Sequence, residues 1–222
     1  MVNNKNILVD ICWTLYKSNT TQDFIDFVAT DKSYRRWRRL QRSRTVRFLL
    51  HAYVRLTGID PWRRYAVRQL RGMPREQLTI KAEEFVSGLE QRKVEPVWQL
   101  FDNAQHIVLL SSTLDIVAQA VAGKLPREPE QVMASTLGFD GDMCTGEITS
   151  DRLTQKLTDS QAAKFRPYTI ITDNISDLPL IAKSRQAYIV TYRNQWRWKR
   201  RLANMNKSNH SITFIPSNGE HY

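Results

Sequence analysis

The apolar residues of the chain form short continuous runs near its start and in its second half. Such runs of aliphatic and β-branched side chains are typical of strands buried in a parallel sheet. They lie at residues 7–9, 107–110, 169–172 and 187–191. The first run ends at Asp10, the second at Ser111 and the third at Asp173. We therefore expect strands whose carboxyl ends carry polar or acidic side chains.

Between the first two runs, the sequence of residues 20–103 predicts helices and no strands. Phe24, Phe27 and Val28 have the i, i+3, i+4 spacing of one helical face. Further helices are expected over residues 61–70 and 74–91. Gly58 and Pro61 end another predicted helix, whose apolar face comprises Val46, Leu49, Leu50, Tyr53 and Val54.

From residue 106 onward, strands alternate with predicted helices, at residues 114–123, 153–165 and 178–184. A hairpin or two short strands are expected at residues 132–137 and 146–148, around the turn pair Asp140-Gly141. Alternating strands and helices predict a parallel α/β sheet. The expected fold class is therefore α/β: a three-layer Rossmann-like parallel sheet with an all-helical cap inserted after the first strand.

The expected division of the chain follows from this pattern. Residues 1–17 and 104–193 would form the α/β core, and residues 18–103 the Arg-rich helical cap. Residues 194–222 would form a basic C-terminal extension, with residues 212–215 as a short strand or docking element.

Three acids are expected at one edge of the sheet. Asp10 and Asp173 end two of the apolar runs, and Asp177 follows four residues later. The carboxyl ends of neighbouring parallel strands converge. Taken alone, Asp10 could be a metal ligand, a nucleophile or a turn residue. Three carboxylates gathered there would repel each other unless a cation held them, and oxygen ligands suit Mg²⁺.

The same edge would receive groups that can bind phosphate. Ser111, with Ser112 beside it, precedes a predicted helix N-terminus, where a hydroxyl and N–H groups favour an anion. Lys156 could add a fixed positive charge. A carboxylate, Mg²⁺, a hydroxyl and a lysine are together what phosphoryl transfer through an aspartyl-phosphate requires.

These motifs resemble those of the haloacid dehalogenase (HAD) superfamily, closest to its phosphoserine-phosphatase-like branch with a helical cap (subfamily IB). Residues 7–15 are similar to the first motif, Asp-x-Asp-x-Thr, and residues 108–113 to the second. Residues 172–180 (TDNISDLPL) resemble the fourth motif. The third motif requires only a lysine; Lys156 has the better spacing and Lys164 is the alternative.

The resemblance implies a metal site and a nucleophile. Asp10 would attack phosphorus and bind Mg²⁺, and the backbone carbonyl of Cys12 would be a second ligand. Asp173 would bind the metal directly. Asp177 would bind it or orient a water on it.

The resemblance also implies how phosphate is held. Ser111, Ser112 and Lys156 would contact the phosphoryl oxygens, with Lys156 also screening Asp10. Thr14 would help to set the loop. The implied function is Mg²⁺-dependent hydrolysis of a phosphate monoester through an aspartyl-phosphate.

One catalytic position departs from the family pattern. Cys12 and then Trp13 stand where the family's phosphatases have a general acid–base aspartate followed by a small residue. A thiol with a reference pKa near ~8.5 is a poor substitute beside carboxylates, and losing such a group typically costs ~10²–10⁴ in rate. Three hypotheses remain open. The protein could be a phosphatase with a good leaving group or another acid from the cap. It could perform a related transfer with a long-lived aspartyl-phosphate, or bind an anionic partner on a catalytically impaired scaffold.

Charge is concentrated in the predicted cap. Residues 31–75 contain fourteen Lys or Arg and two acids, a net charge of +12 within a chain whose total is +11. Residues 34–39 (YRRWRR) and 195–201 (QWRWKRR) interleave aromatic side chains with cations. This chemistry suits a polyanionic or phospholipid-like substrate, or a peripheral contact with an anionic membrane or nucleic acid.

Composition adds an expected location. The chain is 41% hydrophobic and 25% charged, and its longest apolar stretch is broken by polar residues. No segment reads as a signal peptide or a membrane span. Two cysteines are too few for a disulfide scaffold. We expect a cytoplasmic protein, with peripheral membrane contact as an option, and no pattern in the sequence indicates its oligomeric state.

Overall fold

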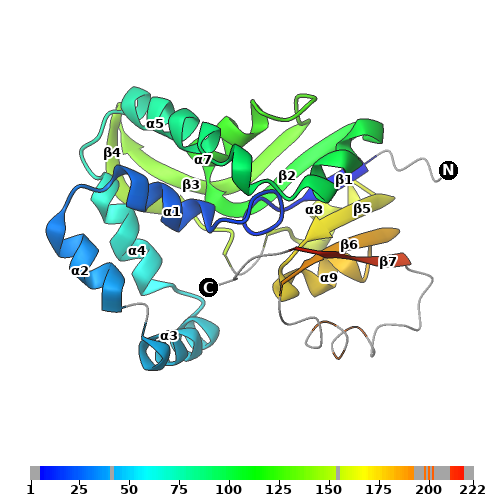
Figure 1. Ribbon diagram of the computed structural model, residues 1–222, viewed down its shortest axis with the longest axis horizontal. Helices are drawn as coiled ribbons and strands as arrows, with labels where there is room; N and C mark the ends of the chain where they lie inside the picture. Colours follow the sequence, from blue (N-terminus) through cyan, green and yellow to red (C-terminus); the bar gives the residue numbers. More distant parts are fainter. Residues whose placement is uncertain are drawn as a thin grey trace.

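The computed structural model describes residues 6–40, 43–153, 156–192 and 211–217, together with 198, 200 and 202. Its centre is a seven-stranded sheet in the order β4-β3-β2-β1-β5-β6-β7 (Figure 1). Neighbouring strands are parallel except β3 and β4, which form the expected antiparallel hairpin. The strands are β1 (Asn6–Val9), β2 (His106–Leu114), β3 (Gln131–Asp140), β4 (Met143–Ser150), β5 (Tyr168–Thr172), β6 (Gln186–Thr191) and β7 (Ser211–Pro216). The predicted α/β class is confirmed.

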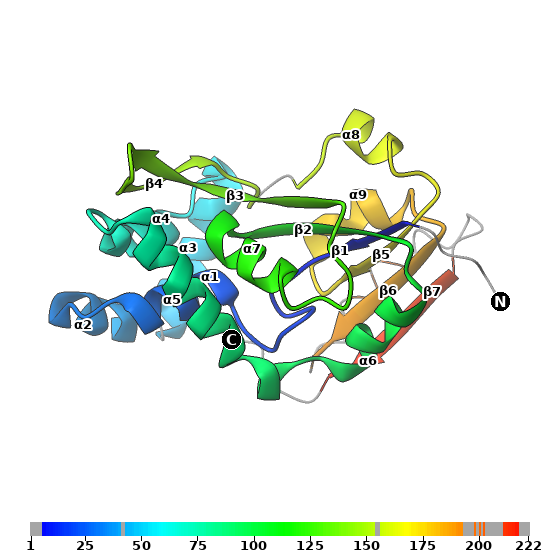
Figure 2. The same ribbon diagram turned by 90° about the horizontal axis from the view of Figure 1, so that it is seen from above.

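Side chains of β1 alternate between the two faces of the sheet, as strand geometry requires. Ile7 and Val9 join the apolar core formed with α1 (Thr20–Val28), α5 (Arg75–Ser87), α6 (Glu95–Trp98) and α7 (Asp115–Ala122). Leu8 belongs to the opposite core, with α8 (Asp159–Ala163) and α9 (Leu178–Ile181). Figure 2 shows these helices on the two sides of the sheet. The sheet is therefore the middle of three layers.

Helical residues fill the segment between β1 and β2. Besides α1, α5 and α6 it contains α2 (Lys32–Leu40), α3 (Arg44–Thr57), α4 (Pro61–Val67) and the 3₁₀ turns η1 (Arg68–Leu70), η2 (Glu90–Arg92) and η3 (Gln99–Asn103). Gly58 ends α3 with a φ of 70°, a left-handed conformation that glycine adopts without strain. In Figure 1 the helices α2 and α3 lie at one end of the molecule, away from the sheet, whereas α4 packs beside β4.

The helix predicted over residues 153–165 is wrong in extent. Among the described residues of this range only α8 is helical, and Lys156, Leu157 and Thr158 lie outside it. The physical reason is a capping box: the Thr158 hydroxyl accepts from the N–H of Gln161, while the Gln161 side chain accepts from the N–H of Thr158. This pair begins the helix at Asp159 and leaves the preceding residues free to reach the sheet edge.

The C-terminal part contributes a strand to the core sheet. The short strand expected near residues 212–215 is β7, which pairs with β6 and extends the core sheet. Within the basic residues 195–201, Trp198 is buried in the same apolar core as Leu202, whereas Arg200 is exposed. Trp198 therefore packs inside and offers no aromatic surface to a partner; the other residues of 195–201 lie outside the described part of the chain. None of the described helices is long and apolar enough to cross a bilayer.

Candidate active site

Asp10 lies where β1 ends in the middle of the sheet. Its N–H donates to the carbonyl of Ile171 on β5 at 3.0 Å, which continues the pairing of the two strands by one residue. Its Oδ1 accepts from the N–H of Ile11 at 2.7 Å. The carboxylate is 5% exposed. The strand order therefore places a buried carboxylate at the carboxyl edge of the sheet, as the sequence predicts.

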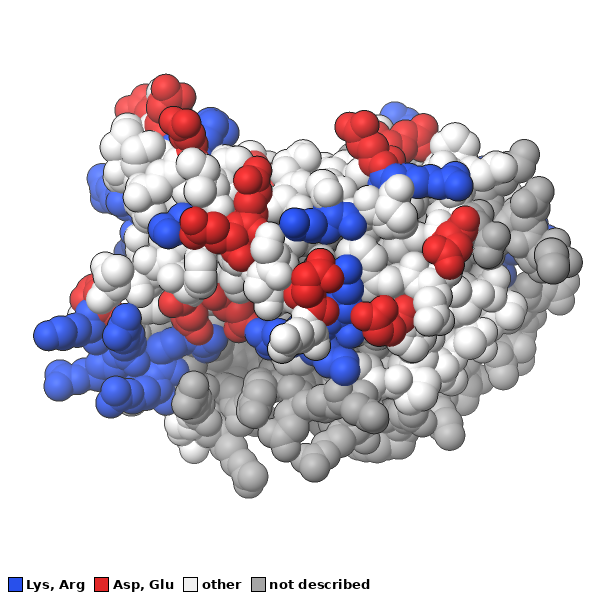
Figure 3. Space-filling model, turned by 45° about the horizontal axis from the view of Figure 1, so that its top comes forward, with Lys and Arg blue, Asp and Glu red and all other residues white. Residues whose placement is uncertain are grey.

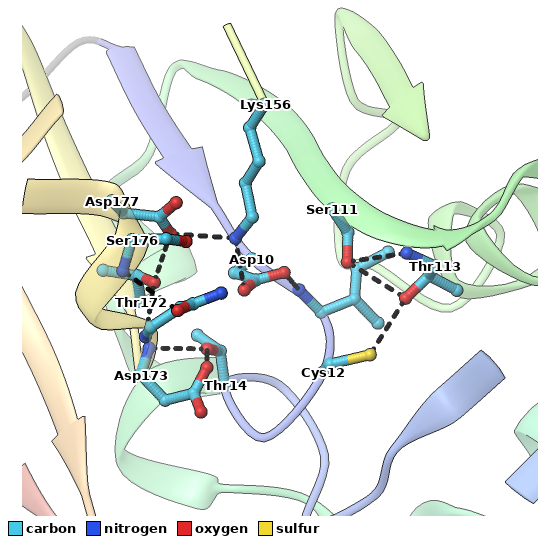
Figure 4. Close-up of polar contacts among 12 residues, drawn as sticks. Asp10, Cys12, Thr14, Ser111, Thr113, Lys156, Thr172, Asp173, Ser176 and Asp177 are labelled. Atoms are coloured by element: carbon cyan, nitrogen blue, oxygen red, sulfur yellow. Dashed lines mark hydrogen bonds and ion pairs between the residues drawn. The ribbon is translucent and has the colours of Figure 1, made fainter. Parts of the chain in front are cut away.

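Lys156 reaches this carboxylate from the segment between β4 and α8 (Figure 4). Its Nζ lies 2.5 Å from Oδ2 of Asp10 and 2.8 Å from Oδ2 of Asp177. Burial by itself would lower the pKa of Lys156, but the two carboxylates outweigh it and raise the pKa above its usual range. The alternative lysine, Lys164, is exposed at the end of α8. Lys156 is thus a fixed ammonium between two acids.

The segment that carries Lys156 is itself held at the sheet edge. Arg152 donates from Nη1 to the carbonyl of Lys156 at 2.6 Å and from Nε to the carbonyl of Ala134 on β3 at 3.2 Å. Its backbone N–H donates to the buried Ser135 hydroxyl at 3.0 Å. These contacts fix the Lys156 backbone without a helix.

Asp177, in the turn η4 (Ile175–Asp177), is the second acid on Lys156. Its Oδ2 also accepts from the hydroxyl of Thr172 at 2.6 Å. Burial, and then the charge of Asp10, raise the pKa of Asp177, while Lys156 and Thr172 oppose that rise. Asp177 therefore positions Lys156 directly, a contact that the sequence motif did not indicate.

Asp173 is tied to the loop after β1 through Thr14. The Thr14 hydroxyl donates to Oδ1 of Asp173 at 3.1 Å and accepts from the Asp173 N–H at 3.0 Å. Thr14 is fully buried, and in Figure 4 the carboxylate of Asp173 turns toward it. The reciprocal pair joins two loops that are far apart in sequence and next to each other at the sheet edge.

Trp13 gives the loop after β1 a tight, strained turn. Its φ is 54°, which non-glycine residues rarely adopt. The N–H groups of Thr14 and Leu15 donate back to the Ile11 carbonyl at 3.3 and 3.0 Å. The Tyr192 hydroxyl donates to the Trp13 carbonyl at 2.9 Å, and the two rings pack edge to face at 5.4 Å. These contacts hold the turn that follows Cys12.

The Cys12 thiol points into a cluster of hydroxyl groups. Its Sγ lies 2.9 Å from the Thr20 hydroxyl and 3.2 Å from that of Thr113, and these two hydroxyls are 2.7 Å apart. Ser111 continues the cluster, with its Oγ 3.0 Å from Thr113. Burial first, and then the charge of Asp10, raise the pKa of Cys12. The thiol is therefore neutral, and it is a weak acid for protonating a leaving group.

The two predicted phosphate-binding serines differ in their surroundings. Ser111 is fully buried, and its hydroxyl accepts from the Thr113 N–H at 3.2 Å. The Ser112 carbonyl accepts from the guanidinium of Arg63 on α4, which also donates to Asp151 at 2.6 Å. Strand β2 continues to Leu114 and α7 begins at Asp115, one residue after the expected start of the helix.

Several residues of the site carried no sequence signal that singled them out. Thr20 and Thr113 reach Cys12 from α1 and β2, and Arg63 reaches the end of β2 from α4. Arg63 belongs to the basic segment of residues 31–75, yet it is only 8% exposed. Their roles depend on which elements the fold brings together.

The oxygen donors at this edge fit a magnesium ion by type and charge. Among the described residues, no group of three or more His, Cys, Asp or Glu side chains is arranged as a metal cluster. A Mg²⁺ site needs fewer protein ligands than that, because proteins hold Mg²⁺ through one or two carboxylates together with waters and substrate phosphate. The carboxylates of Asp10 and Asp173 and the main-chain carbonyl of Cys12 are oxygen groups of this type. With Asp177, the acids exceed the single ammonium of Lys156 within this group, and the surplus favours a cation.

The chain belongs to the family of haloacid dehalogenase-like hydrolases, whose sequence profile matches residues 7–182. This confirms the family that the motifs indicated. A comparison with curated protein sequences finds no significant match.

Solved structures share the fold at low sequence identity. A protein of unknown function from Bordetella pertussis is 15% identical, with 95% of this chain and 98% of that chain covered and a TM-score of 0.67. Cytosolic 5'-nucleotidase IIIB bound to cytidine is 11% identical, with 97% and 82% covered and a TM-score of 0.58. A substrate-bound phosphoserine phosphatase is 12% identical, with 92% and 99% covered and a TM-score of 0.53.

Proposed function

We propose that the chain is a magnesium-dependent phosphohydrolase that cleaves a phosphate monoester through an aspartyl-phosphate on Asp10. The observation that carries the proposal is the buried contact of Lys156 with Asp10 and Asp177 at the carboxyl edge of the sheet. A buried carboxylate beside a fixed ammonium suits a nucleophile that must approach a phosphoryl group of the same charge. The family and the fold of the phosphatase neighbours support this chemistry.

In the proposed first step, a carboxylate oxygen of Asp10 attacks phosphorus and the ester P–O bond breaks. The electron pair of that bond leaves with the alcohol oxygen, which then needs a proton. Lys156 would hold a phosphoryl oxygen and reduce repulsion between Asp10 and the substrate, and Ser111 and Ser112 would contact the others. Asp10, Asp173 and the Cys12 carbonyl would bind Mg²⁺, and Asp177 would bind it or orient a water on it. The bound Mg²⁺ would supply positive charge for the phosphoryl oxygens.

In the second step, water attacks phosphorus and the bond to Asp10 breaks, which releases phosphate and restores the carboxylate. Cys12 occupies the position of the group that would exchange protons in both steps. Its thiol is neutral and is surrounded by the hydroxyls of Thr20 and Thr113. We therefore expect fast turnover only for substrates whose leaving group needs little protonation, such as aryl or acyl phosphates.

The alternative is a catalytically impaired member of the family that binds an anionic partner through its basic helices. The replacement of an acid by Cys12 favours this hypothesis, because the general acid–base contribution is typically ~10²–10⁴ in rate. Under this alternative, the scaffold would be retained and the chemistry lost.

An aryl phosphate assay with and without added magnesium distinguishes the proposed phosphohydrolase from the catalytically impaired binding protein. The proposal expects magnesium-dependent release of phosphate that EDTA abolishes, and no release by Asp10→Asn with the circular dichroism spectrum unchanged. Asp140→Asn, at the exposed hairpin turn, is the matched control and should keep wild-type activity. Hydrolysis by Asp10→Asn would refute the role of Asp10. No hydrolysis by the wild type over a broad panel of monoesters would favour the alternative.

A further inference from the structure

Helix α3 presents large apolar side chains to solvent. Phe48 is 75% exposed, Leu49 63%, Tyr53 47% and Leu56 87%. Leu49, Tyr53 and Leu56 have the i, i+4, i+7 spacing of one helical face, with Phe48 beside it. Isolated exposed apolar residues are ordinary, but a contiguous group of this size indicates a surface that another body covers.

Helix α2, immediately before α3, presents cations. Arg35 and Arg39 are exposed, as are Lys32 and Arg36. Figure 3 shows basic side chains gathered at the end of the molecule where α2 lies. A hollow of about 450 Å³ on this helix is lined by Lys32, Ser33, Arg36, Trp37 and Leu40.

The two helices are close in sequence and α2 is anchored to the rest of the fold. Three residues separate the end of α2 from the start of α3. The last residue of α2, Leu40, is 57% exposed. The Trp37 ring packs at 4.4 Å from the rings of both Trp62 and Tyr65 around α4. The cationic helix is therefore held in place by a cluster of three aromatic rings.

We propose that α2 and α3 form a docking surface for the interface of an anionic lipid bilayer. The apolar face of α3 would enter the boundary between headgroups and acyl chains. The cations of α2 would contact the anionic headgroups, and the hollow beside Trp37 would accept a phosphate. Amphipathic helices that combine apolar side chains with cations bind membranes by this combination of buried apolar area and charge attraction.

Charge and side-chain type favour a bilayer over other occupants. A second copy of the chain could cover the apolar face of α3, but it would bring an equally cationic segment, since residues 31–75 carry a net charge of +12. Nucleic acid would satisfy the charge, and Phe48 and Tyr53 could stack on bases, but the aliphatic side chains of Leu49 and Leu56 would remain exposed to water. An anionic bilayer satisfies both features.

Vesicle sedimentation tests the surface without any need for catalysis. The probes are vesicles of phosphatidylcholine alone and vesicles in which a third of the lipid is phosphatidylglycerol. The full chain should sediment with the anionic vesicles and remain in solution with the neutral ones. Raised salt should weaken the binding. Absence of binding to anionic vesicles at low salt would overturn the proposal.

Two sets of variants separate the apolar contribution from the charge. The double variant Phe48→Ser with Leu56→Ser should lose at least tenfold in vesicle affinity. Its matched control changes two exposed apolar residues elsewhere, Ile80→Ser on α5 with Met143→Ser on β4, and should bind as the wild type does. Both pairs are exposed, so all four positions can change with little effect on the core. Unchanged binding by the α3 variant would overturn the proposal.

The charge variant is Arg35→Gln, Arg36→Gln and Arg39→Gln, and it should also lose at least tenfold. Its control neutralises three exposed cations outside α2: Lys124→Gln, Arg166→Gln and Arg185→Gln. Equal loss in the control would mean unspecific attraction and would refute the docking surface. Binding of a single-stranded RNA without binding of vesicles would assign the surface to nucleic acid. Loss of vesicle binding on self-association would assign it to a second copy.

Discussion

The ammonium of Lys156 lies 2.5 Å from the carboxylate of Asp10, although 146 positions separate the two residues in the sequence. A second carboxylate, that of Asp177, contacts the same ammonium at 2.8 Å. All three side chains are almost completely buried. Charges out of contact with water are tolerated only when they are paired. We therefore expect both the stability of this edge of the sheet and catalysis to depend on Lys156.

Lys156→Met should destabilise the protein by about 3–5 kcal/mol near neutral pH, because it leaves two buried carboxylates without their cation. Lys164→Met, at an exposed position, is the control. Unfolding in urea measures the free-energy difference. Adding Asp177→Asn to Lys156→Met should restore part of the loss, since it removes one of the uncompensated charges. A loss no larger than that of the control would contradict the buried pairing.

Cys12→Asp should raise turnover of an alkyl phosphate by ~10-fold or more, because it supplies the missing acid, whose contribution is typically ~10²–10⁴. The hydroxyls of Thr20 and Thr113 lie within hydrogen-bond distance of the present thiol and could donate to the new carboxylate. Aryl phosphates should gain less, because their leaving groups need less protonation. Cys12→Ala is the control for removal of the thiol. A slower Cys12→Asp enzyme would mean that the thiol has a role of its own.

Thr14→Val should raise the magnesium concentration needed for half-maximal rate. The change removes both hydrogen bonds to Asp173 and leaves its N–H without that partner. The free energy of unfolding should fall by ~1–3 kcal/mol. Thr14→Ser keeps the hydroxyl and should restore the magnesium dependence. Equal magnesium dependence in the valine and serine variants would show that Thr14 does not position Asp173.

Asp115→Asn should change how stability depends on pH. Burial raises the pKa of Asp115 above that of an ordinary aspartate, despite hydrogen bonds that oppose the rise. A raised carboxyl pKa contributes stability that is present at low pH and is lost as pH rises through the folded-state value. The Asn oxygen can still accept from the N–H groups of Ile116 and Leu137.

The stability of Asp115→Asn relative to the wild type should therefore increase as pH rises from about 4, near the ordinary pKa of aspartate, toward neutrality. Urea unfolding at several pH values measures this difference, with the exposed Asp140→Asn as the control. A difference that does not vary with pH would show that the carboxyl group of Asp115 titrates normally.

The amino-acid sequence by itself determined the strands, the family motifs and the order of the acids. Asp10 and Asp173 could be found because each ends a short apolar run, and such a run is typical of a buried strand whose carboxyl end reaches the edge of the sheet. Gly58 could be identified as a helix end because its left-handed conformation is favourable for glycine. The start of α8 was also encoded, in the capping box of Thr158 and Gln161, but the apolar spacing around it indicated a longer helix.

Only the tertiary structure decided what surrounds these residues. The contact of Cys12 with Thr20 and Thr113 joins three elements, and local sequence carries no information about which elements pack together. The apolar face of α3 shows the same limit. Periodicity predicted that Leu49 and Tyr53 share a face, yet that face is exposed, because periodicity reports the sidedness of a helix and not what covers it.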